Sequence, residues 1–280
     1  LHWMVRRQRQ MCIRDSIRKL IYEKTSVILP DNKVYFVESR LAPIANSEKL
    51  NSVSQLIAQL RTNPWNDLHK RAIEALLTTE TFFFRDYYPF EALRKFILPE
   101  LINKRKIDSS LNIWSSACSS GQEPYSIAIL LQEHFPQINS WNVSIIASDI
   151  SEEMLKLSRI GNYNHNQVNR GLSVSLRNKY FQQQGNKWQI IPEISRRVQF
   201  QQLNLCKIWN NLPKMDLIFL RNVLIYFDIK NKRNVLFQVR QLLKPDGYLF
   251  LGGGETTVNI DDNFEYVKFE KAICYRLRSK

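Results

Sequence analysis

The segment IWSSACSSGQEPYSIAI (residues 113–129) indicates the class of fold that this chain adopts. A β-rich run, Leu111 to Ser115, enters a loop of small residues, and a helix is expected to start at Pro124, where a missing N–H is harmless. Gly121 permits the positive φ of a tight strand-to-helix turn. The glycines of a dinucleotide G-x-G-x-x-G turn are absent, so the loop favours a ligand without phosphates.

Beyond this segment, strand-like and helix-like stretches continue to alternate along the chain. Further β-rich runs are Val143–Ser148, Val198–Leu203, Asp216–Leu220 and Tyr248–Leu251. Tyr266–Phe269 and Ile273–Leu277 alternate like a closing antiparallel pair. The pattern predicts an α/β, Rossmann-like fold with a mostly parallel, seven-stranded sheet covered on both faces.

The second run ends at Asp149, whose carboxylate is placed to accept hydrogen bonds from a ribose. Ser151 is the expected N-cap of the next helix. Taken alone, Gly121 also fits an ordinary turn and Asp149 a helix-capping carboxylate.

The remaining chain divides by its local pattern. Residues 17–78 show helical spacing interrupted by Pro30, Pro43 and Pro64. A small antiparallel β insert is expected at about 180–200. The expected divisions are an arm that is disordered or non-native (1–16), an N-terminal helical domain (17–78), an interdomain linker helix (79–105) and the α/β domain (106–280).

Composition narrows the functional classes. No apolar run reaches the roughly 18 residues that a membrane-spanning helix needs. The four cysteines lack the spacing of metal ligands, which predicts a reduced, cytoplasmic protein without bound metal. The net charge of +14 favours an acidic partner, which leaves nucleic acid, an anionic membrane surface and an acidic protein open.

Four motifs carry a family resemblance. Residues 113–129 resemble the first cofactor motif of the chemotaxis receptor methyltransferases, the CheR family, and so do LTTETFFFRDYYPFEAL (77–93), ASDIS (147–151) and DLIFLRNVLIYFD (216–228). The resemblance runs from about Ile17 to Leu277. It implies a cofactor, S-adenosylmethionine, which yields S-adenosylhomocysteine when glutamate side chains are esterified on the cytoplasmic helical bundle of a methyl-accepting chemotaxis receptor.

The resemblance also implies site residues. For the cofactor they are Thr79, Thr81, Arg85, Gly121, Glu123, Asp149, Asn204, Leu205, Arg221 and Asn222. Arg85, Arg221 and Tyr226 are expected to orient the acceptor carboxylate, which is ionised at neutral pH and needs no general base. The chain departs from the family at Thr79, where Asn is usual, at Ala117 or Cys118, and at Gln122.

The expected enzyme is a cytoplasmic monomer that inserts into no membrane and binds no nucleic acid. Lys33 and Arg40 either meet the acidic receptor or are simply solvated. A nucleic-acid methyltransferase is a poor second interpretation, because Arg221-Asn222-Val223-Leu224 stands where base amino-methylation uses a [DNS]PP[YFW] motif. A third interpretation is a signalling module that binds the cofactor but has lost activity, which the departures would allow.

Overall fold

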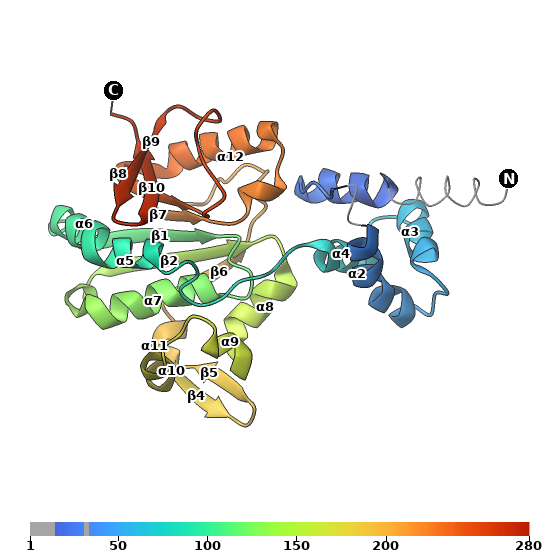
Figure 1. Ribbon diagram of the computed structural model, residues 1–280, viewed down its shortest axis with the longest axis horizontal. Coiled ribbons are helices and arrows are strands. Elements are labelled where there is room, and N and C mark those ends of the chain that lie inside the picture. Colours follow the sequence, from blue (N-terminus) through green and yellow to red (C-terminus); the bar gives the residue numbers. More distant parts are fainter. Residues whose placement is uncertain (1–14, 31–33, 280) are drawn as a thin grey trace. The chain divides into compact units, whose positions relative to one another are not determined.

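The computed structural model describes residues 15–30 and 34–279, which divide into two compact units (Figure 1). The first unit comprises the chain up to Thr78 together with Tyr226–Asp228. The second comprises Thr79–Ile225 and the chain from Ile229 onward. Residues 1–14 of the expected arm and Lys33 lie outside the described residues, whereas residues 15 and 16 already belong to a helix.

The first unit is helical, as expected. Residues 15–25 form a helix, which is followed by α2 (Val34–Ser47), α3 (Val53–Thr62) and α4 (Asp67–Leu76). Ser52 and Asn66 cap α3 and α4 by accepting hydrogen bonds from backbone amides. Pro43 does not break the pattern, because it lies inside α2 between the fully buried Leu41 and the buried Ala45. Burial of this face outweighs the hydrogen bond that proline cannot donate.

The second unit is built on the expected seven-stranded sheet, in the order β6-β2-β1-β7-β8-β10-β9. All pairs from β6 to β8 are parallel, and β10 pairs antiparallel with β8 and β9. The strands are β1 (Ser110–Ser116), β2 (Asn142–Asp149), β6 (Val198–Gln202), β7 (Met215–Leu220), β8 (Leu243–Leu251), β9 (Phe264–Phe269) and β10 (Ala272–Leu277). The Rossmann-like α/β fold is therefore confirmed.

Helices cover both faces of this sheet. In Figure 1, α12 lies on one side, and α7 and α8 lie on the other. The sheet's centre is mostly apolar: every residue of β7 is buried, Asp216 being its one charged residue, and Phe219 stacks on Phe250 with ring centroids 4.5 Å apart. The helices are α5 (Tyr88–Ala92), a π-helical turn (Leu93–Ile97), α6 (Leu98–Lys104), α7 (Gln122–His134), α8 (Glu152–Ile160), α12 (Ile229–Leu242) and the short turns Pro136–Ile138 and Leu224–Tyr226.

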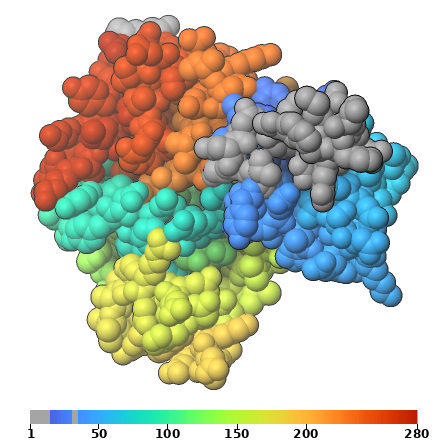
Figure 2. All heavy atoms as spheres, turned by 45° about the vertical axis from the view of Figure 1, so that its right-hand side comes forward, coloured from blue at the N-terminus to red at the C-terminus, as the bar shows by residue number. Residues whose placement is uncertain are grey.

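A second, antiparallel sheet forms the expected insert, in the order β3-β5-β4. Its strands are β3 (Asn162–Asn164), β4 (Phe181–Gln184) and β5 (Lys187–Ile190), flanked by α9 (His165–Asn169), α10 (Val174–Tyr180) and α11 (Pro192–Ser195). Its residues gather in one lobe of the surface, yellow in Figure 2. The insert begins earlier than residue 180, because β3 pairs with β5 from Asn162 onward, and Tyr163 of β3 packs against Phe83 and Phe181.

Three local expectations were wrong. Residues 79–87 are not helical, since Phe84, Asp86 and Tyr87 have positive φ values of 49°, 69° and 52°. Helix α7 begins at Gln122 rather than at Pro124. Strand β8 begins at Leu243 rather than at Tyr248, and its pairing with β7 shifts between Leu243 and Tyr248. Within the described ranges, no helix is long and apolar enough to cross a bilayer.

Candidate functional site

The loop after β1 presents backbone rather than bulky side chains. Gly121 is the N-cap of α7 with φ +91°, and a Cβ there would lie 3.0 Å from the Cβ of Ser158. Ala117 and Ser119 also have positive φ, at 51° and 50°. Gly121 therefore has the positive φ that the sequence predicts. A turn of this kind allows a ligand to approach the main chain closely.

Asp149 ends β2 beside this loop. Its Oδ2 accepts from the amide of Ser119 at 2.8 Å, and its Oδ1 accepts from the amide of Ser151 at 2.9 Å. Ser151 also caps α8, as expected. Through these two hydrogen bonds Asp149 ties the loop after β1 to the start of α8.

Glu123 lies in the first turn of α7, where the helix dipole favours a negative charge. Its Oε1 accepts from Ser115 Oγ at 2.8 Å, and its Oε2 accepts from Arg221 Nη1 at 2.8 Å. The side chain is 11% exposed. Glu123 is thus held rigidly between β1 and the residue that follows β7.

Arg221 is the most buried charge of the group, with 1% of its side chain exposed. Besides Glu123, its guanidinium binds Asp86, with 2.6 Å between Nη2 and Oδ2, and the carbonyl oxygen of Arg85 at 2.9 Å. Nε has no hydrogen-bond partner in the described part of the chain. Because both terminal nitrogens already donate to the protein, Arg221 is better placed to hold other residues than to receive a substrate carboxylate.

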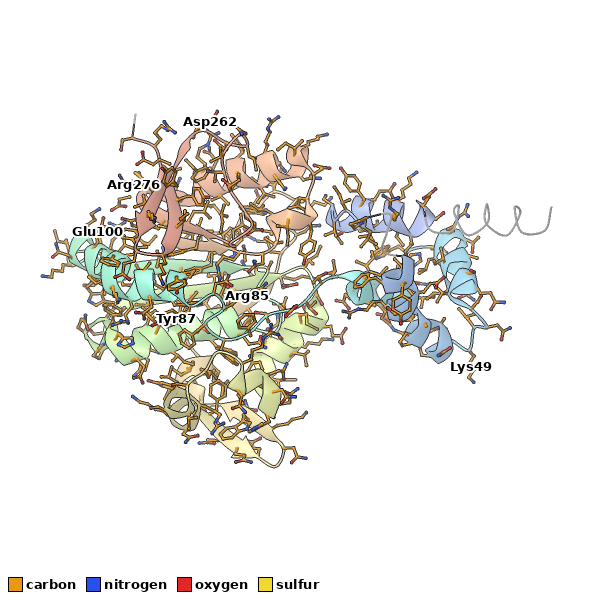
Figure 3. All side chains as sticks on the ribbon, viewed as in Figure 1. Lys49, Arg85, Tyr87, Glu100, Asp262 and Arg276 are labelled. Carbon is orange, nitrogen blue, oxygen red and sulfur yellow. The ribbon has the colours of Figure 1, made fainter. Side chains whose placement is uncertain are left out.

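Segment 79–87 runs along the same edge of the sheet. The carbonyl oxygen of Thr79 accepts from Ser119 Oγ at 2.7 Å, and the amide of Phe84 donates to Ser126 Oγ at 2.9 Å. Phe83 is fully buried in the core, whereas Thr81 is half-buried. Arg85, labelled in Figure 3, donates from Nη1 to the carbonyl oxygen of Glu80 and lies over the ring of Phe82.

Asn222 begins the segment after Arg221 with φ +59°. Its amide and that of Val223 donate to the carboxylate of Glu255 at 2.7 and 2.9 Å, and the amides of Gly252 and Ile225 complete the set. One carboxylate therefore shapes the turn that follows β7. Glu255 is not among the residues expected from the sequence; its signal there is an acidic residue directly after the three glycines that follow β8.

Asn204 and Leu205 follow β6, next to the end of β2. The amide of Leu203 donates to the carbonyl oxygen of Asp149 at 3.0 Å, and Leu205 is buried. Asn204 accepts a hydrogen bond from the amide of Cys206. Both residues thus lie near Asp149.

Tyr226 belongs to the first unit, where its carbonyl oxygen accepts from the amide of Ile28 at 2.9 Å. Its part in the site stays a prediction.

The residues of the second unit described above, without Tyr226, form what we call the carboxyl-edge site. It contains two guanidinium groups, Arg85 and Arg221, and the four carboxylates of Asp86, Glu123, Asp149 and Glu255. Burial raises the pKa of the nearby Cys118 thiol, and the charges of Asp149 and Glu123 raise it further. The thiol therefore stays protonated, and the excess of negative charge suits a cationic ligand better than a phosphate.

Comparison with known proteins identifies the family of the chain. The family model for the CheR methyltransferase all-alpha domain matches residues 15–77. The family model for the CheR methyltransferase SAM binding domain matches residues 79–273. Chemotaxis protein methyltransferase 1 of Pseudomonas aeruginosa is 40% identical over 266 residues, which cover 93% of this chain and 96% of that protein. Chemotaxis protein methyltransferase 1 of Vibrio cholerae is 40% identical over 265 residues, covering 93% and 94%. The chain belongs to the CheR methyltransferase family.

Proposed function

We propose that this protein transfers a methyl group from S-adenosylmethionine to glutamate side chains of a chemotaxis receptor, giving glutamyl methyl esters and S-adenosylhomocysteine. Family membership and the names of the relatives support the reaction class and the receptor. The observation that carries the proposal is the convergence of Gly121, Glu123, Asp149 and Arg221 at the ends of β1, β2 and β7, where open α/β sheets bind ligands.

The carboxyl-edge site suits this cofactor chemically. S-adenosylmethionine carries a sulfonium and an ammonium group, which the surplus of carboxylates favours. In our proposal Asp149 accepts from the ribose hydroxyls, Glu123 faces the methionine part, and Asn204 and Leu205 lie beside the adenine. Thr79, Thr81, Arg85 and Asn222 complete the contacts, with Thr79 replacing a more usual Asn.

The cofactor supplies an electrophilic methyl group, and the acceptor glutamate supplies a carboxylate oxygen that is already ionised at neutral pH. The protein's task is therefore alignment and exclusion of water rather than proton transfer. We assign orientation of the acceptor to Arg85 and Tyr226. Arg221, whose terminal nitrogens bind Glu123, Asp86 and the carbonyl oxygen of Arg85, acts by holding its neighbours in place.

The proposed acceptor is the acidic, helical cytoplasmic part of a methyl-accepting receptor, and the enzyme works as a cytoplasmic monomer. The net charge of +14 supports an acidic partner. Arg40, on α2 of the first unit, is a candidate for this contact.

The test is incubation with radiolabelled S-adenosylmethionine and receptor fragments, followed by measurement of methanol released in alkali. Methyl esters hydrolyse in base, whereas methylated bases of nucleic acid do not. Label that resists alkali, or no transfer despite cofactor binding, would contradict the proposal and point to the nucleic-acid enzyme or the inactive module respectively.

Two substitutions separate cofactor binding from transfer. Asp149→Ala should weaken cofactor binding about 10- to 100-fold, because hydrogen bonds to a charged group are worth about 1.5–3 kcal/mol. Tyr226→Phe should lower turnover about tenfold and leave the cofactor Kd nearly unchanged. Calorimetry and steady-state kinetics measure the two effects, and the reverse pattern would refute these assignments.

A further inference from the structure

Asp86 lies beside Arg85 in the irregular segment before α5, and Figure 3 labels its two neighbours, Arg85 and Tyr87. Its side chain is 45% exposed, yet its Oδ2 lies 2.6 Å from Nη2 of the buried Arg221. We propose that Asp86 is a positioning residue for methyl transfer: bound to Arg221, it fixes the backbone from which Arg85 orients the acceptor. This inference rests on the proposed function.

The contact fastens a strained turn. Phe84, Asp86 and Tyr87 all have positive φ, a conformation that costs free energy in residues other than glycine and persists only where the surroundings enforce it. Nη2 of Arg221 binds the carbonyl oxygen of Arg85 at 2.9 Å as well as Asp86. One guanidinium nitrogen therefore holds both residues on either side of the Arg85–Asp86 peptide bond.

The preceding residues are anchored independently. Thr79 is held by Ser119, Phe83 is buried in the core, and the amide of Phe84 binds Ser126. Loss of the Asp86 carboxylate should therefore loosen the turn from Arg85 onward, so that of the proposed cofactor contacts only that of Arg85 is affected and those of Thr79 and Thr81 stay in place. The consequence is a selective effect on turnover.

Stability should change little when Asp86 becomes neutral. Arg221 keeps its buried contact with Glu123, 2.8 Å from Nη1 to Oε2, so no buried charge is left alone. An ion pair whose carboxylate is largely exposed adds little to stability. A matched control exists in Asp246, which is 34% exposed and pairs with Arg105 at 2.6 Å elsewhere in the second unit.

The experiment compares the wild-type protein with Asp86→Asn, Arg85→Ala, the double variant and Asp246→Asn. In Asp86→Asn, kcat for methyl-ester formation on a receptor fragment should fall about tenfold, because small misplacements of an orienting group are costly. The cofactor Kd should stay within about threefold, and the melting temperature should not change. The double variant should be no slower than Arg85→Ala alone, since Asp86 acts by placing Arg85.

Additive losses in the double variant, or a parallel loss of cofactor affinity and melting temperature, would overturn the inference. An equal loss of turnover in Asp246→Asn would do the same.

A second measurement does not depend on the acceptor. Hydrogen–deuterium exchange should become faster in the peptide that covers residues 84–88 in Asp86→Asn and stay at the wild-type rate in Asp246→Asn. Unchanged exchange would overturn the positioning role. If the wild-type protein forms no methyl esters, the proposed function fails, while exchange still decides whether Asp86 fixes this turn.

Discussion

The two ends of strand β7 carry the same chemical arrangement, an arginine between two carboxylates. At the amino end, Arg105 pairs with Asp216 at 2.7 Å and with Asp246 at 2.6 Å. Asp216 is fully buried and also accepts from Lys244 Nζ and from the amide of Asn112. Asn112 and Asp216 lie in β1 and β7, Lys244 and Asp246 lie in the irregularly paired first part of β8, and Arg105 directly follows α6.

Past the carboxyl end of β7, the arrangement around Arg221 differs in its backbone. Asp86 and Asn222 flank it with φ values of +69° and +59°. Strain of this kind is retained where a site must be held in one geometry. The two ends thus share their ion pairing and differ in their backbone: among the residues named here, only those at the Arg221 end have positive φ values.

The largest expected effect is on stability at the amino end. Asp216→Ala leaves two cations, Arg105 and Lys244, without their shared buried partner. Breaking a buried ion pair in this way should reduce the free energy of unfolding by about 3–5 kcal/mol. Urea denaturation measures the loss.

Because Asp216 lies at the opposite end of β7 from the carboxyl-edge site, we expect the cofactor affinity and turnover of the folded Asp216→Ala protein to stay within about twofold of wild type. A large change in cofactor Kd at a temperature where the variant is folded would remove the distinction between the two ends.

The sequence predicts most of the fold, because buried strands are continuous apolar runs bounded by turn signals. Each of the seven expected strands of the main sheet is present, and Ser151 caps α8 as expected. Strand β3 was missed, since its three residues are too short for any periodicity. The helix predicted over residues 79–87 fails because tertiary contacts of Arg221 and Ser126 override local propensity.

The candidate site was only partly predictable. Gly121 and Asp149 follow from the strand-to-helix rhythm, and their local geometry is as expected. The environment of Arg221 was not predictable, because its partners Glu123 and Asp86 lie 98 and 135 residues away along the chain. Pairing over such distances depends on strand order, which a single sequence does not reveal.

A smaller effect, on turnover, is expected at the carboxyl end of β7. There Glu255→Gln tests whether the shape of the turn after β7 matters for methyl transfer. The carboxylate accepts from the amides of Asn222, Val223, Ile225 and Gly252, and an amide side chain must turn an N–H toward some of these donors. Turnover should fall about tenfold, because the turn after β7 loses its fixed shape. Kinetics on a receptor fragment measure this, and calorimetry should show a weaker cofactor Kd as well, because Asn222 is one of the proposed cofactor contacts. Unchanged turnover would show that this turn takes no part in transfer.

The smallest effect concerns acid stability at the amino end. Hydrogen bonds from Arg105 lower the pKa of Asp246 below its ordinary value. Such a carboxyl adds stability above its unfolded pKa of about 3.9 and loses it as the pH falls through the lower folded pKa. Asp246→Asn should therefore be less stable than wild type at pH 7, by under about 1 kcal/mol because the carboxylate is partly solvated, and the two proteins should converge below about pH 4. Urea midpoints between about pH 3 and 7 test this, with Asp262→Asn as an exposed control. A difference that does not depend on pH would mean that packing, rather than charge, makes the contribution of Asp246.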